Sequence, residues 1–479
     1  MPMIGMGADI SALIDATVAG DSNQIITTAR ALLRQGAPAA VLLARVGMIA
    51  AHGDSDGHGI LILNAAAELS RWLNVLPRNP AEDPRSRERE LPLLVQALVA
   101  TAAAVSAGQA AHDTYPEPLF PSELPEGETV NEKMHEAIYG NDAALVERLL
   151  FGLYGTGADY RTMQVRIYDG ISTTFQNDGH PLIFAVRGTQ LLDAVEWGDR
   201  APNILHWLTP HLPLHGDEPV WVNSVRTFLA GPGHSLASYR TRLAAPKEES
   251  ALPLRRLLPS NADTTQVCQG VYDALIKRGA SARGVGSVIA LAAADTMELV
   301  SDADRDAFVR AAHWLLFTAA VRLVFTQVQD PEALPLLFTS AAFINTLHKG
   351  LGEQGTAAQT QPVARSASLG GGLIASALLE TLSQQLQAQD LAGSLSTARR
   401  YLQLGHDKRA LWAIIGLAAA QADAAADQGH TLQIAHAAGE EFMAWPATLP
   451  DINIDGFLQV ALRAVVFAKR NTLVTGLKE

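Results

Sequence analysis

The chain has 479 residues, of which 48% are apolar and only 18% are charged. Its net charge of −13, without any basic run, argues against nucleic acid or an anionic membrane surface as a binding partner. Its single cysteine, Cys268, excludes an intrachain disulfide and a cysteine-ligated iron–sulfur cluster within this chain. The N-terminal sequence lacks signal-peptide features, and the longest apolar run, residues 411–422, is too short for a membrane span, so we expect a cytoplasmic protein.

Alanine and leucine recur at helical spacing along most of the chain, and the alternation typical of strands is scarce. This pattern predicts an all-α fold, a multi-helical array of antiparallel helix pairs with internal pseudo-repeats. In chain order, we expect helices over residues 9–20, 22–35, 38–51, 58–76, 88–107, 132–139, 142–154, 158–175, 180–196, 263–278, 283–300, 304–327, 331–350, 373–388, 391–404, 407–427, 430–444 and 455–470.

Proline-rich and glycine-rich stretches divide these helices into four units. They are an N-terminal unit of residues 1–112, a second of 132–230, a third of 262–351 and a C-terminal unit of 373–479. The polar, glycine-rich residues 352–372 are the best candidate for a linker. One continuous all-α domain is the alternative to four separate units.

One local pattern recurs in all four units, a histidine at the head of an apolar helix. Glycine directly precedes the histidine in three of the four instances. This regularity suggests related helical units packed about a common centre, where the imidazoles converge as metal ligands do in helix bundles. Local caps or unrelated core histidines are the alternative interpretation. The four histidines are His58, His180, His313 and His430.

Three stretches around these histidines resemble segments of a helical domain that accompanies Rieske-type [2Fe–2S] ferredoxin modules in bacteria. They are DGHGILILNAAAEL (56–69), NDGHPLIFAVRGTQLLDA (177–194) and GHDKRALWAIIGLAAAQADAAADQGHTLQIAHAAGEEF (405–442). More loosely, the helical layout with scattered histidines is similar to questin oxidase-like proteins. On this resemblance His58, Asn64 and Glu68 match the first segment, His180 matches the second and His430 the last.

The chain departs from that family because it has no Cys–His motif of a Rieske module. It therefore carries no cluster of its own. The resemblance then implies either a separate ferredoxin as electron donor or the loss of redox chemistry.

Other potential ligands lie close together in the sequence. His436 and Glu440 share one helix face, and Asp427 with His430 has the acidic-x-x-His spacing of half a di-iron ligand set. Ion pairs, helix caps or a solvated connector explain such groups without a metal. Two further groups are His52, Asp54, Asp56 and His58 in the stretch HGDSDGH, and His206, His211, His215 and Asp217 in a proline-rich loop.

The sequence contains no dinucleotide fingerprint, phosphate loop or Gly-x-Ser-x-Gly elbow. We therefore do not expect an NAD-dependent or serine-hydrolase function. The first hypothesis is a metal-dependent oxidoreductase or oxygenase in a biosynthetic pathway, with iron as the first metal and a pathway enzyme or ferredoxin as partner. Haem held by two histidines is a variant. The predicted metal site consists of His58, His180, His313 and His430, with Glu68 or Asp56 completing or orienting the shell.

The second hypothesis is a non-catalytic helical partner or scaffold that binds a peptide or an enzyme in a groove between helices. The low charge and abundant alanine would then serve helix packing and interfaces of a homo-oligomer.

Overall fold

The structure is a computed structural model that describes residues 9–76, 88–111, 114–195, 197–239, 246–301, 304–328, 330–351, 372–446, 449 and 453–478. Within these ranges the regular elements are helices, together with one isolated bridge between Ala422 and Arg470. The predicted all-α, multi-helical fold is therefore confirmed. Most of the predicted linker, residues 352–371, lies outside the described residues.

The first two predicted units contribute twelve of the longer helices to the described part of the chain. The predicted helix over 88–107 is broken at Thr101, where α5 and α6 meet at an angle of 60°. The helices are α1 (Ser11–Val18), α2 (Ser22–Arg34), α3 (Ala39–Ala50), α4 (His58–Trp72), α5 (Leu91–Ala100), α6 (Ala102–Ala110), α7 (Val130–Tyr139), α8 (Ala143–Gly155), α9 (Tyr160–Ile171), α10 (His180–Leu192), α11 (Ala201–Leu208) and α12 (Val220–Ala230).

The remaining helices lie in the third and fourth predicted units, except for α14, which lies between the second and third units. The helix predicted over 407–427 ends earlier, at Ala419, because the following residues form the loop that caps α22. These helices are α14 (Leu254–Leu257), α15 (Thr264–Tyr272), α16 (Ala282–Met297), α17 (Arg305–Gln327), α18 (Pro335–Leu351), α19 (Gly372–Gln387), α20 (Leu391–Gln403), α21 (Lys408–Ala419), α22 (His430–Ala444), α23 (Asp455–Val466) and α24 (Thr472–Thr475).

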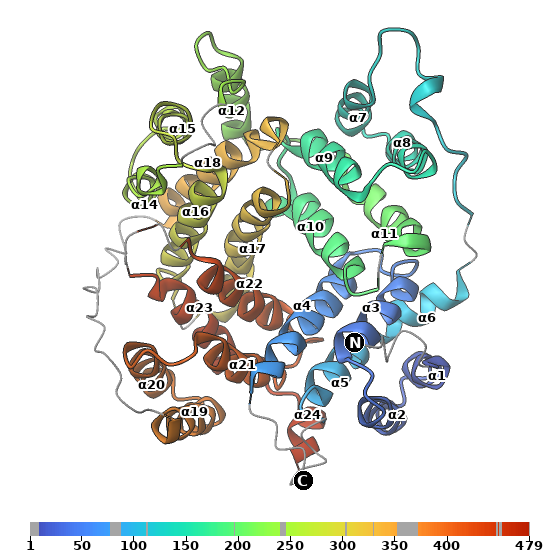
Figure 1. The fold of residues 1–479 in the computed structure, drawn as a ribbon, viewed down its shortest axis with the longest axis vertical. Helices are drawn as coiled ribbons and strands as arrows, with labels where there is room; N and C mark the ends of the chain where they lie inside the picture. Colours follow the sequence, from blue (N-terminus) through green and yellow to red (C-terminus); the bar gives the residue numbers. More distant parts are fainter. Residues whose placement is uncertain are drawn as a thin grey trace.

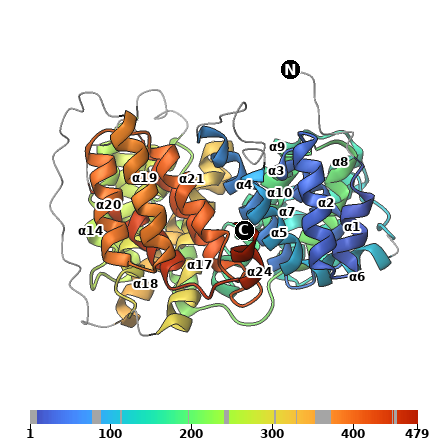
Figure 2. The ribbon, with the colours of Figure 1, turned by 90° about the horizontal axis from the view of Figure 1, so that it is seen from below.

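Four helices, one from each predicted unit, form a ring at the centre of the molecule (Figure 1). α4 packs against α10, α10 against α17, α17 against α22, and α22 against α4. The other helices surround this ring: α3 covers α4, α16 covers α17, and α21 and α23 cover α22. Seen from below, α1 and α2 lie at one end, α19 and α20 lie at the other, and α4 and α10 lie between them (Figure 2).

The ring helices are apolar on nearly every face because each is covered by both its ring neighbours and the outer helices. Within the described ranges, α17 is the one helix that is long and apolar enough to cross a membrane. The run of residues 411–422 does not meet this criterion. However, 78% of its apolar window is buried inside the protein, a pattern typical of a core helix.

Candidate metal centre

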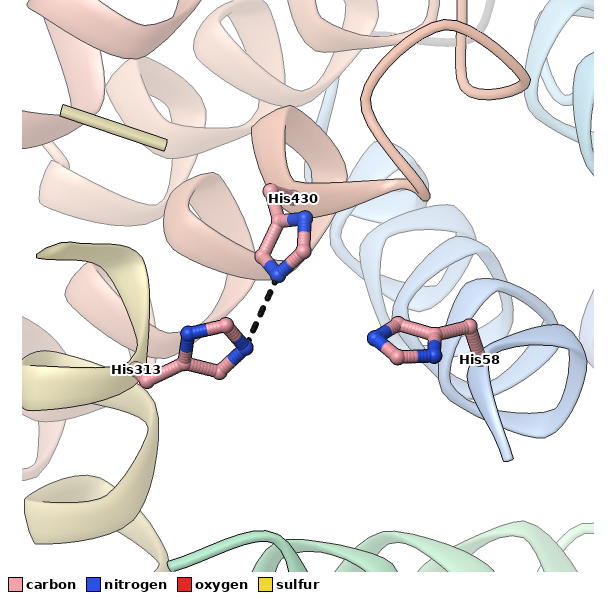
Figure 3. A group of neighbouring side chains, drawn as sticks. All are labelled: His58, His313 and His430. Atoms are coloured by element: carbon pink, nitrogen blue, oxygen red, sulfur yellow. Dashed lines mark hydrogen bonds between the residues drawn. The ribbon is translucent and has the colours of Figure 1, made fainter. Parts of the chain in front are cut away.

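The structure brings together the four histidines that recur in the sequence, one from each ring helix. Ring centroids are 5.4 Å apart for His58 and His180, 4.5 Å for His180 and His313, 4.8 Å for His313 and His430, and 5.8 Å for His430 and His58. The imidazoles thus follow the cyclic order of the helices. Ligand nitrogens of His58, His313 and His430 all lie within 4.8 Å of one another, and Figure 3 shows these three rings turned toward a common point.

Three of the four histidines are the first residue of their helix, as the sequence predicted, but His313 is not. His58, His180 and His430 each follow a glycine with positive φ, whereas α17 begins at Arg305, two turns before His313. The sequence pattern at His313 therefore reflects a position within a long helix. The left-handed backbone of the three glycines turns the chain into each helix at the height of the histidines.

The glycines also explain why the ring closes tightly. A Cβ atom at Gly57 would lie 2.4 Å from Phe184, one at Gly179 would lie 2.2 Å from Phe317, and one at Gly429 would lie 2.3 Å from Ile62. Each of these contacted side chains lies four residues after the histidine of the neighbouring ring helix. Each Gly-His segment thus packs on the turn that follows the histidine of the next helix around the ring, and only glycine leaves room for that contact.

Backbone carbonyl groups fix the orientation of all four imidazoles. Nδ1 of His58 donates to the carbonyl of Asp56 at 3.2 Å, and Nδ1 of His313 donates to that of Arg310 at 3.0 Å. His430 donates to Asp427 at 2.5 Å, and His180 donates to the carbonyl of Asn177 in the same way. A carbonyl oxygen only accepts hydrogen bonds, so each Nδ1 carries the proton and each Nε2 carries a lone pair.

The Nε2 atoms are thus neighbouring electron-pair donors that have no N–H group between them to form a hydrogen bond. Nε2 of His313 and Nε2 of His430 lie 3.0 Å apart, marked by the dashed line in Figure 3. Nε2 of His180 is buried without a hydrogen-bond partner among the described residues. Two nitrogens that each bind one ion at about 2.1 Å lie about 3.0 Å apart when they subtend a right angle. The spacing therefore fits a shared metal ion.

A proton bound to one Nε2 could also bridge two imidazoles, but burial disfavours the charged ring that this would produce. Burial, together with the neighbouring imidazoles, lowers the pKa of His313 to about 3 and the pKa of His430 to about 4. The pKa of His180 is lowered for the same reason. At neutral pH these rings are uncharged, which is the protonation state that binds a metal.

Acidic side chains at the helix starts act as caps rather than as ligands. Asp54 accepts hydrogen bonds from the backbone N–H groups of Gly59 and Ile60 at 2.9 and 2.8 Å, and its burial raises its pKa to about 6. Asp427 accepts from the N–H and hydroxyl of Thr431. The predicted pair of metal ligands, Asp427 and His430, therefore interacts in another way: the Asp427 carboxylate caps α22, and its backbone carbonyl accepts a hydrogen bond from His430.

Asp56 and Glu68, the two carboxylates predicted beside the histidines, differ in position. Asp56 lies next to His58, 3.6 Å from its Nδ1, and its side chain is 69% exposed. It therefore orients the ring from outside. Glu68 lies ten residues further along α4, about 15 Å from His58 by the helical rise, so it cannot complete the same shell.

Glu68 instead belongs to a second polar layer, which we call the charged layer, on the same ring helices. Arg187 donates to Glu440 at 3.1 Å, and the buried Arg322 donates to the buried Glu441 at 2.7 Å. Glu440, predicted to chelate with His436, is thus held by a guanidinium group. The charged layer comprises Glu68 and Arg71 of α4, Arg187 of α10, Arg322 of α17, and Glu440 and Glu441 of α22.

The histidines of the proline-rich loop separate in the structure. His206 contacts Glu147 through Nδ1 at 2.5 Å and stacks on His52 with centroids 5.7 Å apart. His215 contacts the carbonyl of Pro210. His211 alone reaches the ring, where it packs on Phe184 with centroids 4.7 Å apart. Sequence reasoning gave His211 no role distinct from its loop neighbours.

Comparison of the chain with models of known protein families, with curated proteins and with solved structures finds no match. The resemblance to the Rieske-associated helical domain and to questin oxidase-like proteins therefore stays a prediction. The chemistry of the centre rests on its own geometry.

Proposed function

We propose that this protein is a metal-dependent oxidoreductase or oxygenase whose four central histidines hold one divalent transition-metal ion, with iron as the first candidate. A single observation carries the proposal. Four imidazoles from four helices have Nδ1 hydrogen-bonded to a backbone carbonyl, which leaves the lone pair of each Nε2 available to bind a metal. Nε2 of His313 and Nε2 of His430 lie 3.0 Å apart. Without a cation, buried lone pairs would face one another.

The ligand chemistry favours iron, copper, zinc or nickel over magnesium or calcium, because imidazole nitrogen is the donor and no carboxylate lies in the set of His58, His313 and His430. The carboxylate of Asp56 lies 3.6 Å from Nδ1 of His58 and is exposed enough to turn toward the site. Histidine ligands leave coordination positions open, and a bound redox metal supplies Lewis-acid and electron-transfer chemistry.

The chain's own residues hold and shield the site. Backbone carbonyls keep each imidazole in one tautomer and orientation, and the apolar side chains of Ile62, Phe184 and Phe317 exclude water beneath the rings. His430 is buried, while His58, His180 and His313 are half-buried, so a small substrate would have to enter where these three rings meet solvent.

The haem variant fits this geometry less well. Two axial histidines on one iron hold their Nε2 atoms about 4 Å apart with a porphyrin between them. Here Nε2 of His313 and Nε2 of His430 are 3.0 Å apart, and each ring also contacts another imidazole. The partners expected from the resemblance, a separate ferredoxin or a pathway enzyme in the cytoplasm, remain part of the proposal.

Metal analysis and an absorption spectrum of the purified protein test this function. We expect about one metal ion per chain in the wild type and a loss of at least ten-fold in occupancy for His58→Ala and for His430→Ala. His135→Ala is the control, because His135 pairs with Asp169 on α7 and α9, outside the ring. A wild type that takes up no iron, copper, zinc or nickel would contradict the proposal.

A second candidate, a non-catalytic helical partner, has one observation in its favour. The exposed side of α20 lines an open cavity of about 500 Å³ in which a helix or peptide would find both apolar and basic contacts. A metal-free protein that binds one defined partner through this face would support it. The lining residues are Ala392, Leu395, Ser396, Arg399, Arg400 and Gln403.

A further inference from the structure

A fifth imidazole lies at the edge of the histidine ring. His211 ends the short 3-10 helix of residues 209–211, which packs against α8, α10 and α11. Its ring stands 4.7 Å from that of Phe184. Phe184 in turn contacts His180 at 5.2 Å and His58 at 6.4 Å. His211 therefore flanks the side of the ring formed by His58 and His180.

The hydrogen-bonding state of His211 sets it apart from its neighbours in the same segment. Its Nε2 is buried and has no hydrogen-bond partner among the residues that the structure describes. His215, four residues later, is exposed and contacts the carbonyl of Pro210 through Nε2. A buried imidazole nitrogen normally has a hydrogen-bond partner, so Nε2 of His211 is available to bond a group outside the protein chain.

His211 is also not equivalent to the four ring histidines. It comes from outside the ring helices, and it shares with His180 a contact to Phe184. Its burial and the nearby His180 lower its pKa to about 4, so the ring is uncharged at neutral pH. A neutral imidazole has one proton, which Nε2 can carry and donate.

We propose that His211 is a ligand-positioning residue, whose Nε2 donates a hydrogen bond to a small anionic ligand bound at an open position of the metal centre. This inference rests on the proposed metal site and extends it to the chemistry of the ligand. The class comprises azide, hydroxide and carboxylate, which coordinate a metal through one atom and accept a hydrogen bond at another or at the same atom.

The test uses the full-length protein loaded with Co²⁺, with azide as the probe and visible absorption as the readout. We expect His211→Ala to weaken azide binding at least ten-fold, in line with one lost hydrogen bond to a charged group. Its Co²⁺ stoichiometry and its spectrum without azide should equal those of the wild type. His211→Gln, which keeps an N–H donor, should recover most of the affinity, and His215→Ala should bind azide as the wild type does.

Three outcomes would overturn the inference alone. They are wild-type azide affinity in His211→Ala, loss of Co²⁺ from that variant, which would make His211 a ligand, and a Co²⁺-loaded wild type that binds no azide. A wild type that takes up no Co²⁺ would instead end the proposed metal site, and this inference with it.

Discussion

The four ring helices carry two layers of buried polar side chains, and these side chains find their partners in opposite ways. In the histidine layer, four imidazoles bond a backbone carbonyl through Nδ1, and Nε2 of His313 lies 3.0 Å from Nε2 of His430. In the charged layer, about 10–15 Å further along the helices, three arginines face three glutamates. We propose that the first layer takes up a cation from outside the chain, whereas the second layer pairs three arginines with three glutamates of its own.

This difference separates stability from function on one scaffold. Buried ion pairs such as Arg322 with Glu441 are costly to break, because the remaining charge loses its partner in a medium of low polarity. Metal-binding histidines contribute to the free energy of unfolding mainly when the metal is bound. We therefore expect substitutions in the charged layer to change the free energy of unfolding, and substitutions in the histidine layer to change metal content.

The largest effect is expected from breaking the buried pair in the charged layer. Arg322→Ala leaves the fully buried Glu441 without its cation and should lower the free energy of unfolding by about 3–5 kcal/mol. Urea denaturation measures this loss. The folded fraction of the variant should keep the wild-type metal content, and His313→Ala on the same helix should show the reverse behaviour.

An apolar replacement of both partners sharpens the same point. Arg322→Met combined with Glu441→Leu removes both charges together and should cost less than Arg322→Ala alone. A double variant that is as stable as the wild type but has lost its metal would show that the charged layer shapes the histidine layer, so the two layers would not act independently.

The second prediction concerns the tight contact between neighbouring ring helices. Gly57→Ala should destabilise the protein by about 2–4 kcal/mol, because a Cβ is disfavoured at φ +80° and would also clash with Phe184. Gly157→Ala is the matched control: its φ is +74°, but no atom lies within 4 Å of the added Cβ. Only the backbone cost of about 1 kcal/mol remains there. Equal losses in thermal unfolding would remove the steric argument.

The third prediction uses acid to separate His436, which lies near the charged layer, from the ring histidines. Burial lowers the pKa of His436 to about 3, against an ordinary value of about 6.5. Below pH 6.5 the unfolded chain binds a proton that the folded chain refuses, so stability falls as the pH falls toward 3. At pH 5 this loss is about 2 kcal/mol.

The comparison is made on metal-free protein, where the ring histidines titrate alike in both samples. His436→Gln should lose less stability than the wild type between pH 7 and pH 5, by about those 2 kcal/mol. Parallel stability curves for the two proteins over that range would contradict the assigned direction of the shift.

The ring was accessible to sequence reasoning because its contacts have a local signature. Gly-His followed by an apolar residue four positions after the histidine occurs at residues 57–62, 179–184 and 429–434, and the structure places these segments side by side. The common origin of the four units stays a prediction. His313 shows the limit of the signature, since the same apolar string there lies inside a helix that started at Arg305.

The charged layer left no such signature. Its members come from four helices at unrelated spacings, and nothing local distinguishes the buried Arg322 from an exposed arginine. His211 was hidden for the same reason: its neighbours His206 and His215 face elsewhere, and only tertiary packing brings it to Phe184. Glu68 was assigned to the metal through the resemblance of its segment, whereas about 15 Å of helical rise on α4 separates it from His58.

The smallest effect is expected at Glu68, and it tests that reassignment. Burial raises the pKa of Glu68, so its charge is already disfavoured, and its ion pair with Arg71 is 40% exposed on the arginine side. Glu68→Gln keeps an acceptor for Arg71 and should change the free energy of unfolding by less than about 1 kcal/mol. Metal content should equal that of the wild type, whereas loss of metal would return Glu68 to the histidine layer. The two layers would then be one site, because a carboxylate so far along α4 affects the ion only if the ring helices transmit its charge or its packing.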